Sequence, residues 1–157
     1  MNDHALVDAL AQYRAGLDAE IALLEQLALV AARQRGVTVR RDFEQLGIEG
    51  DERDRLTRAL VAVEEGLQPV RARLSAARDR VATLGGYAEV VALRQQASGL
   101  VARILATDEE SMQSLADAEL ARRAAVASLE QGETTLAAYR RVLTPSISQA
   151  SLVDRRG

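Results

Sequence analysis

The sequence predicts an all-α protein: an elongated antiparallel helical bundle or coiled coil with three long helices and one short corner helix. Of the 157 residues, 29 are Ala and 22 are Leu, whereas only 3% are aromatic and 10 are Gly. A chain rich in Ala, Leu, Glu and Arg and poor in turn residues is typical of long helices and coiled coils. The apolar residues also recur at heptad spacing, which supports the same fold class.

The first long helix is expected to begin with Asp3 as its N-cap and to run to Arg35, where Gly36 ends it. Its apolar residues lie three or four positions apart with one irregular step: Leu6, Leu10, Tyr13, Leu17, Ile21, Leu24, Ala28 and Ala31. Residues 37–50 are less regular, and a short helix is expected at 42–46. We interpret this segment as a corner whose apolar residues close the end of the bundle: Val39, Phe43, Leu46 and Ile48.

A second long helix is expected from Asp51 or Glu52 to Leu84. Its apolar residues follow each other at steps of 4 and 3 without a break, which is an a/d heptad repeat. They are Leu56, Leu60, Val63, Leu67, Val70, Leu74, Ala77, Val81 and Leu84. Pro69 predicts either a kink near Gly66 or a break into two helices, and the unbroken repeat favours one kinked helix.

Gly85 and Gly86 predict a helix stop, followed by a third helix from Tyr87 to Leu143. At 1.5 Å per residue this helix would be on the order of 85 Å long, against about 50 Å for each of the other two. Part of it should therefore project or be covered by a second protomer, so we expect a homodimer. Its best apolar seam is Val90, Ala97, Val101, Ile104, Asp108, Ser111, Leu115, Ala118, Arg122, Ala125, Leu129, Gly132, Leu136, Tyr139 and Leu143.

Residues 1–143 are expected to form one domain and the Ser-rich residues 144–157 a flexible tail. The absence of Cys and the single His4 argue against thiolate or multi-histidine metal sites, catalytic triads and cofactors. The net charge of −3 with interleaved signs argues against nucleic-acid binding. The sequence has no stretch of about 18 uncharged apolar residues, so no membrane span is predicted. The N-terminus lacks the basic region of a signal peptide, so the cytoplasm is the expected compartment.

Two polar clusters on the third helix have both a functional and a structural interpretation. Asp108 and Ser111, with Glu109 and Glu110 beside them, could bind a cation or set the register. A solvated stretch where the helix leaves the bundle is favoured, because these acids lack a second ligand cluster. The other cluster is Glu119, Arg122, Arg123 and Glu130 with Gln131 and Glu133. It could bind an anion, but pairs within the helix explain it adequately.

The end of the third helix carries the candidate partner-binding site, which consists of Leu136, Tyr139, Val142 and Leu143. Such a stripe is either plain core or a surface for dimerisation or partner binding. Because this helix is longer than its neighbours, we expect its end to lack cover within the chain, and an exposed apolar stripe is typical of a binding surface. No arrangement of residues suited to nucleophilic, acid–base or metal catalysis is found, so an enzyme is not expected.

Three stretches together resemble the FlgN-type flagellar export chaperones. The first is YRAGLDAEIALLEQLALVAA at 13–32, which resembles the acidic, Leu-rich first helix of that family, and the second is GDERDRLTRALVAVEEGL at 50–67, which resembles its second helix. The third is ILATDEESMQSLADAELARRAAVASLEQGETTLAAYRRVL at 104–143, which closes on Leu136-x-x-Tyr139 as the final helix of the family does. The corner around Phe43 and the internal Pro69 have no counterpart in the family.

The resemblance implies a small cytoplasmic all-helical chaperone. It would keep hook–filament junction proteins soluble and deliver them to the flagellar type III export gate. The resemblance also implies that the C-terminal region contacts the substrate and that Tyr139 takes part in docking to the gate. The expected function is therefore non-catalytic shielding of a client helix at 136–143. A structural coiled-coil adaptor with a different helical client is the alternative, and a ligand-binding or enzymatic bundle is the alternative of another class.

Overall fold

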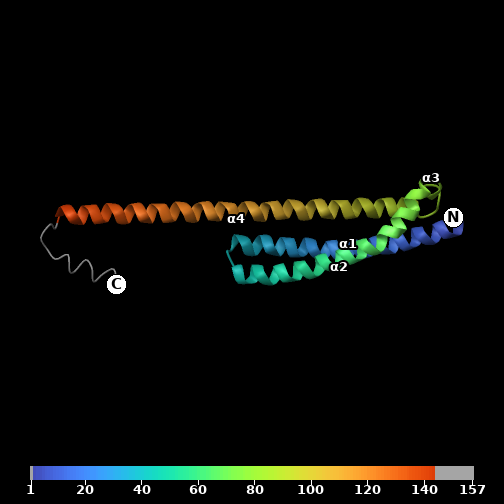
Figure 1. The fold of residues 1–157 in the computed structure, drawn as a ribbon, viewed down its shortest axis with the longest axis horizontal. Helices are drawn as coiled ribbons and strands as arrows, with labels where there is room; N and C mark the ends of the chain where they lie inside the picture. Colours follow the sequence, from blue (N-terminus) through green and yellow to red (C-terminus); the bar gives the residue numbers. More distant parts are fainter. Residues whose placement is uncertain (1, 144–157) are drawn as a thin grey trace. The chain divides into compact units, whose positions relative to one another are not determined.

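The computed structural model describes residues 2–143, except for the side chains of residues 134, 135 and 139–143. Within this range it contains α1 (Asp3–Val39), α2 (Phe43–Ala76), α3 (Arg78–Val81) and α4 (Tyr87–Leu143) (Figure 1). The described chain is therefore all-α, as predicted, with long helices that pack against each other. It divides into two compact units, Met1–Leu115 and Ala116–Gly157, which are described separately. The expected tail, residues 144–157, lies outside the described residues.

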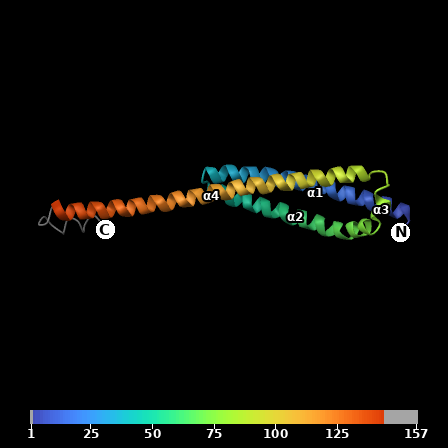
Figure 2. The ribbon, with the colours of Figure 1, turned by 90° about the horizontal axis from the view of Figure 1, so that it is seen from above.

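In the first unit, α1 and α2 form an antiparallel hairpin, and the first part of α4 lies beside it (Figures 1 and 2). Polar pairs define the directions of the helices. Gln12 and Arg33 of α1 contact Arg73 and Glu49 of α2, so residue numbers fall along α2 as they rise along α1. The α1–α4 ion pairs Arg14–Glu89 and Arg35–Glu110 both join residues 75 positions apart, so these two helices run parallel.

The core of this unit consists of two apolar clusters along the hairpin. The first contains Leu6, Ala9, Leu10, Tyr13 and Leu17 of α1 with Leu67, Val70, Leu74, Val81 and Val90. The second contains Ile21, Leu24, Leu27, Val30 and Ala31 of α1 with Leu56, Leu100 and Ile104. All nine apolar residues of the heptad repeat predicted at 56–84 are buried or half-buried. The strongest periodic pattern of the sequence is therefore the face that α2 and α3 turn to the core.

α1 begins at Asp3, as predicted, but its N-cap lies one residue earlier than predicted and its end lies four residues later. Asn2 is the N-cap of α1, because its side chain accepts a hydrogen bond from the backbone N–H of Ala5 at 2.9 Å. At the other end, α1 continues through Gly36 to Val39. It is closed by Arg41, which adopts a left-handed conformation with φ of 57°. The N–H groups of Arg41 and Asp42 then donate to the carbonyls of Thr38 and Val37, which is the Schellman arrangement of a helix end.

The described chain has no separate corner helix at residues 37–50, where a short turn at 40–42 joins α1 directly to α2. Asp42 caps α2 by accepting a hydrogen bond from the N–H of Gln45 at 3.1 Å, and the helix then continues through Gly47 and Gly50. Val39, Phe43 and Ile48 are exposed rather than buried at a bundle end, and only Leu46 of the predicted set is half-buried. A strong cap placed five residues before Gly47 outweighs the helix penalty of one glycine, which is about 1 kcal/mol.

The short helix of the fold lies later in the chain than predicted. α2 passes through Pro69 without ending there, as the heptad repeat indicated, and ends at Ala76. The four-residue α3 follows, and its Val81 continues the buried face. Gly86, with φ of 90°, then makes the predicted turn into α4.

The core-facing residues of α4 differ by one position from the predicted seam. Val101 is exposed, whereas the neighbouring Leu100 is buried with Val90 and Ile104. Leu93 and Ala97 are half-buried and complete a regular 3–4 spacing from Val90 to Ile104. The prediction stepped from Ala97 to Val101 instead of Leu100, which rotates the face by about 100°.

Candidate partner-binding site

The predicted partner-binding residues belong to the second unit, and the structure describes one of their side chains. Leu136 lies on α4 with 50% of its surface exposed. Tyr139, Val142 and Leu143 also belong to α4, but their side chains lie outside the described residues. The structure therefore places Leu136 on an accessible helix face, and the grouping of all four side chains stays a prediction.

All residues from 120 to 133 of α4 are exposed, and five exposed residues of this unit follow a heptad-like spacing, which we name the distal stripe: Arg122, Val126, Leu129, Glu133 and Leu136. Their steps of 4, 3, 4 and 3 place all five side chains on one side of the helix. Leu129 is the most exposed of the stripe's three apolar residues, at 69%. Leu120 is similarly exposed but lies on another side of the helix. An amphipathic helix of a partner can pack against such a stripe.

Arg122 of the distal stripe and its neighbour Arg123 both pair with Glu119 within the helix, as the sequence predicted. Glu119 accepts hydrogen bonds from Arg122 at 2.8 and 3.0 Å and from Arg123 at 3.0 Å. Hydrogen bonds from these two arginines lower the pKa of Glu119 to about 2. Both arginines are therefore paired with an acid of the same helix, which favours the structural interpretation over an anion-binding site.

Asp108 was predicted to lie in a solvated stretch, and this was wrong. Both its carboxylate oxygens accept hydrogen bonds from Arg53 of α2 at 2.6 Å, and Arg53 also donates to Gln34 of α1 at 2.8 Å. Both side chains of the ion pair are largely shielded, at 27% and 29% exposure, and the hydrogen bond from Arg53 to Asp108 raises the pKa of Arg53. The contact joins three helices, which agrees with the alternative that Asp108 sets their register.

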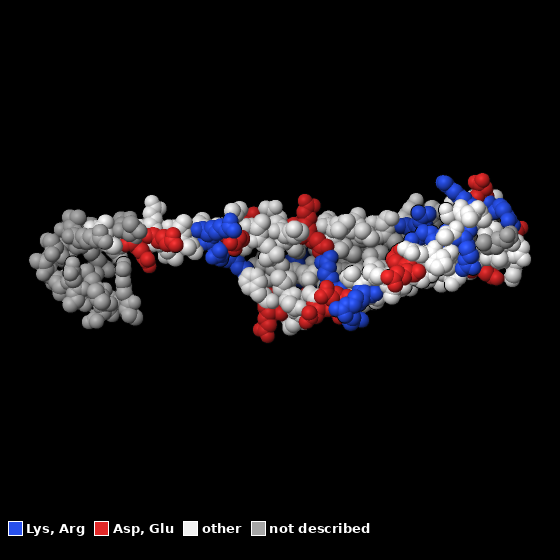
Figure 3. Space-filling model, in the orientation of Figure 1, with Lys and Arg blue, Asp and Glu red and all other residues white. Residues whose placement is uncertain are grey.

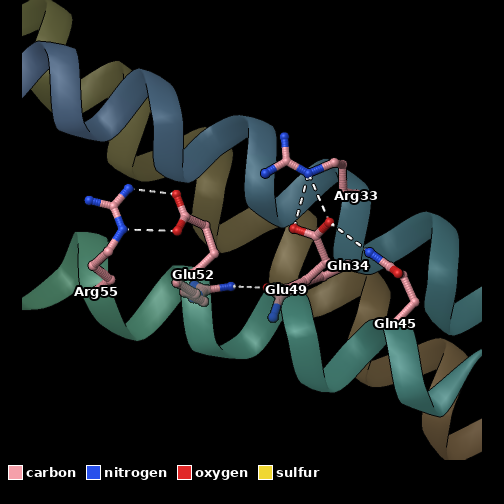
Figure 4. Close-up of polar contacts among 7 residues, drawn as sticks. Arg33, Gln34, Gln45, Glu49, Glu52 and Arg55 are labelled. Atoms are coloured by element: carbon pink, nitrogen blue, oxygen red, sulfur yellow. Dashed lines mark hydrogen bonds and ion pairs between the residues drawn. The ribbon is translucent and has the colours of Figure 1, made fainter.

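A second ion pair joins the two helices of the hairpin near its turn. Glu49 of α2 is buried, and both its oxygens accept hydrogen bonds from the Arg33 side chain at 3.0 Å, while Gln45 donates to it at 3.4 Å (Figure 4). Glu52 and Arg55 pair on the surface of α2 in the same view. Acidic and basic side chains lie next to one another on the visible face of the first unit (Figure 3). These charges are used for packing of the helices.

Sequence reasoning missed a buried acid, Glu20 of α1, which lies near the half-exposed Glu64 of α2. Glu20 is 5% exposed, and its Oε1 is buried without a hydrogen-bond partner in the described part of the chain. The heptad count contains a signal for it, because Glu20 lies three residues after Leu17 and four before Leu24. The prediction assigned Ile21 to the stripe and treated this step as irregular. Both residues are buried.

Two general properties bear on the class of function. Within residues 2–143, every helix falls short of the combined length and hydropathy that a membrane span requires. The described residues contain no group of three or more His, Cys, Asp or Glu side chains placed to hold a metal ion. In comparisons with known proteins, no family model, no curated protein and no solved structure matches the chain.

Proposed function

We propose that this chain is a non-catalytic helix-binding protein and that its binding surface is the distal stripe of α4. The observation that carries the proposal is the 4–3–4–3 spacing of five exposed side chains, three of them large and apolar. Large apolar side chains that recur at this spacing are typical of a helix face that another helix covers.

The stripe is too small to bind a partner tightly by itself. Burial of a large apolar side chain contributes about 1.5–3 kcal/mol, and Val126, Leu129 and Leu136 are already partly shielded. Their sum is of the same order as the translational and rotational cost of association, roughly 4–15 kcal/mol. A stable complex therefore needs a longer contact, and we propose that it continues through Tyr139, Val142 and Leu143.

The specific role that we propose is that of a cytoplasmic flagellar export chaperone. Its support is the ordered resemblance of three stretches to the FlgN-type family, together with the all-α fold. In this mechanism, an amphipathic helix of a hook–filament junction protein lies along the stripe and is prevented from assembling before export. Tyr139 would then serve the contact with the export gate.

Binding of client helices tests this proposal. We expect the full-length chain to bind the terminal helices of hook–filament junction proteins in calorimetry, and Leu129→Asp or Leu136→Asp to weaken binding at least tenfold. Each change places a charge in an apolar contact, which costs more than about 1.4 kcal/mol. Leu120→Asp is the matched control, because it adds the same charge to an equally exposed leucine outside the stripe.

Two results would count against the proposal. If Leu120→Asp weakens binding as much as Leu136→Asp, the effect comes from charge and not from the stripe. If Leu136→Asp, Tyr139→Ala and removal of residues 145–157 all leave binding unchanged, the client contacts a different surface. Binding of unrelated coiled coils with equal affinity would instead favour a structural adaptor.

A further inference from the structure

The level of the hairpin at Glu20 and Glu64 separates the two apolar clusters of the first unit. On α1, the first cluster ends with Leu17 and the second begins with Ile21. Glu20 and Glu64 approach each other in between, close enough that a hydrogen bond between their carboxyls shifts the pKa of both. The core is therefore interrupted on α1 by one buried acid, Glu20, which lies beside the half-exposed Glu64.

The one cation that acts on both acids is already engaged by Glu64. Arg71 of α2 donates to both oxygens of Glu64 at 3.1 and 3.2 Å, and its guanidinium lies 5.8 Å from the centre of the Tyr13 ring. Glu20 is thus left in the core with a buried oxygen that accepts no hydrogen bond within the described residues. A buried carboxylate without a cation of its own is costly, so the neutral acid is favoured.

The helix α4 supplies no further charge to this pair. The constant separation of the α1–α4 pairs places Arg94 and Gln95 at the level of Glu20, and both residues are exposed. The charged groups that act on Glu20 are Glu64 and Arg71. Burial, followed by the hydrogen bond and repulsion from Glu64, raises the pKa of Glu20 from its ordinary value of 4.5 to about 7. The pKa of Glu64 is lowered, chiefly by the hydrogen bond from Glu20 and then by Arg71.

We propose that Glu20 and Glu64 form a proton-dependent joint between α1 and α2. When Glu20 is protonated, its carboxyl donates the hydrogen to the Glu64 carboxylate, and the two helices pack closely beside it. Gly16, one turn earlier, shows how close this packing is, because a Cβ atom there would lie 2.2 Å from Cδ2 of Leu67. When Glu20 loses its proton, its buried carboxylate and that of the half-exposed Glu64 share the half-exposed guanidinium of Arg71 at the edge of the core, and the packing at this level loosens.

The direction of the pH dependence follows from proton linkage. A group that binds its proton more tightly in the folded chain stabilises the fold fully below its unfolded pKa. For Glu20 this contribution is lost as the pH rises from about 4.5 to about 7. The lowered pKa of Glu64 acts in the opposite direction, but only below 4.5, outside this window. This inference does not depend on the proposed function.

Thermal unfolding of the full-length chain between pH 5 and pH 8 tests the joint. We expect Tm of the wild type to fall over this range relative to that of Glu20→Gln, which keeps a neutral polar side chain at every pH. At pH 8 the variant should be more stable by on the order of 5 °C. Glu25→Gln removes the same charge from an exposed site on α1. Its Tm should change with pH in the same way as that of the wild type.

Local opening is measured by hydrogen exchange in the same proteins. Protection factors of the α1 amides around Gly16–Leu24 should fall between pH 6 and pH 8 in the wild type but stay constant in Glu20→Gln. NMR titration of the Glu20 side-chain carbonyl carbon gives its midpoint directly, even if the variant does not fold. A midpoint near 4.5, or pH profiles of Glu20→Gln and the wild type that coincide, would overturn the proposal.

Discussion

At the scale of single residues, glycines inside the helices have different structural roles. Gly16 allows α1 to approach α2, because a Cβ there would overlap the Leu67 side chain at 2.2–2.8 Å. Gly47 and Gly50 of α2 have no atom within 4 Å of the Cβ position. The first glycine is required by packing, whereas the other two only cost helix stability.

Alanine substitutions should separate these two roles. Gly47→Ala is expected to raise the free energy of unfolding by about 0.5–1 kcal/mol, since it gains helix propensity at no steric cost. Gly16→Ala gains the same propensity but should lower stability by roughly 1–2 kcal/mol because of overpacking. Urea denaturation measures both. Equal effects at the two positions would show that the helices at Gly16 are not as close as described.

Arg41 is a residue in a conformation that favours glycine. Its left-handed φ of 57° costs a side chain about 1 kcal/mol, partly offset by the greater freedom of glycine in the unfolded chain. Arg41→Gly should therefore stabilise the fold by roughly 0.5 kcal/mol in the same denaturation measurement. Arg40 has a right-handed conformation, so Arg40→Gly is the control and should not stabilise. A loss of stability in Arg41→Gly would mean that contacts of the Arg41 side chain stabilise the fold by more than its left-handed conformation costs.

At the scale of helices, periodic apolar patterns were predictable and helix ends were not. The nine-residue repeat at 56–84, the passage through Pro69 and the bounds of α4 were all predicted correctly. Gly36, Gly47 and Gly50 were overvalued as stops, because caps at Arg41 and Asp42 decide where these helices end. Glu20 was missed because a heptad count by apolar residues alone skips a charged residue at a core position.

The Arg53–Asp108 pair contributes to the association of α2 with α4, and its loss should be measurable. Asp108→Asn keeps the size of the side chain but removes the charge, so we expect a loss of about 1–2 kcal/mol in the free energy of unfolding. Glu110→Gln changes the more exposed pair with Arg35 and should cost less than about 0.5 kcal/mol. If the two variants lose the same stability, the partial burial of Asp108 does not strengthen its ion pair.

At the scale of the whole molecule, the fold class followed from composition, whereas partners did not. Ala and Leu in abundance with few turn residues are enough to predict long helices. Which face of a helix stays exposed to solvent depends on small rotations of the helix, such as the one that buries Leu100 in place of Val101. The exposed side chains of Val39 and Phe43 show the same limit, because an apolar residue beside a turn can lie on either side of a helix.

The homodimer expected from the sequence is tested at this scale. Leu129 and Leu136 lie seven residues apart, which favours packing against a second copy of α4 when no client occupies the stripe. Sedimentation equilibrium at tens of micromolar should give twice the chain mass of 17.0 kDa. The variant with both Leu129 and Leu136 changed to Asp should have the mass of one chain. The control Leu120→Asp should keep the mass of two chains. A wild-type monomer at this concentration would exclude the dimer and leave the stripe to a client.

The two ion pairs between α1 and α4 join residues that are 75 positions apart in both cases. This constant separation limits how a natural or engineered relative of the first unit could vary in length. An insertion in α1 alone would shift every later contact with both α2 and α4 by the same number of residues. Only seven residues added to all three helices at one level would keep each ion pair and each apolar face in place. The first unit can therefore grow or shrink only in steps of seven residues, or about two helical turns. Each such step changes the length of a helix by about 10 Å.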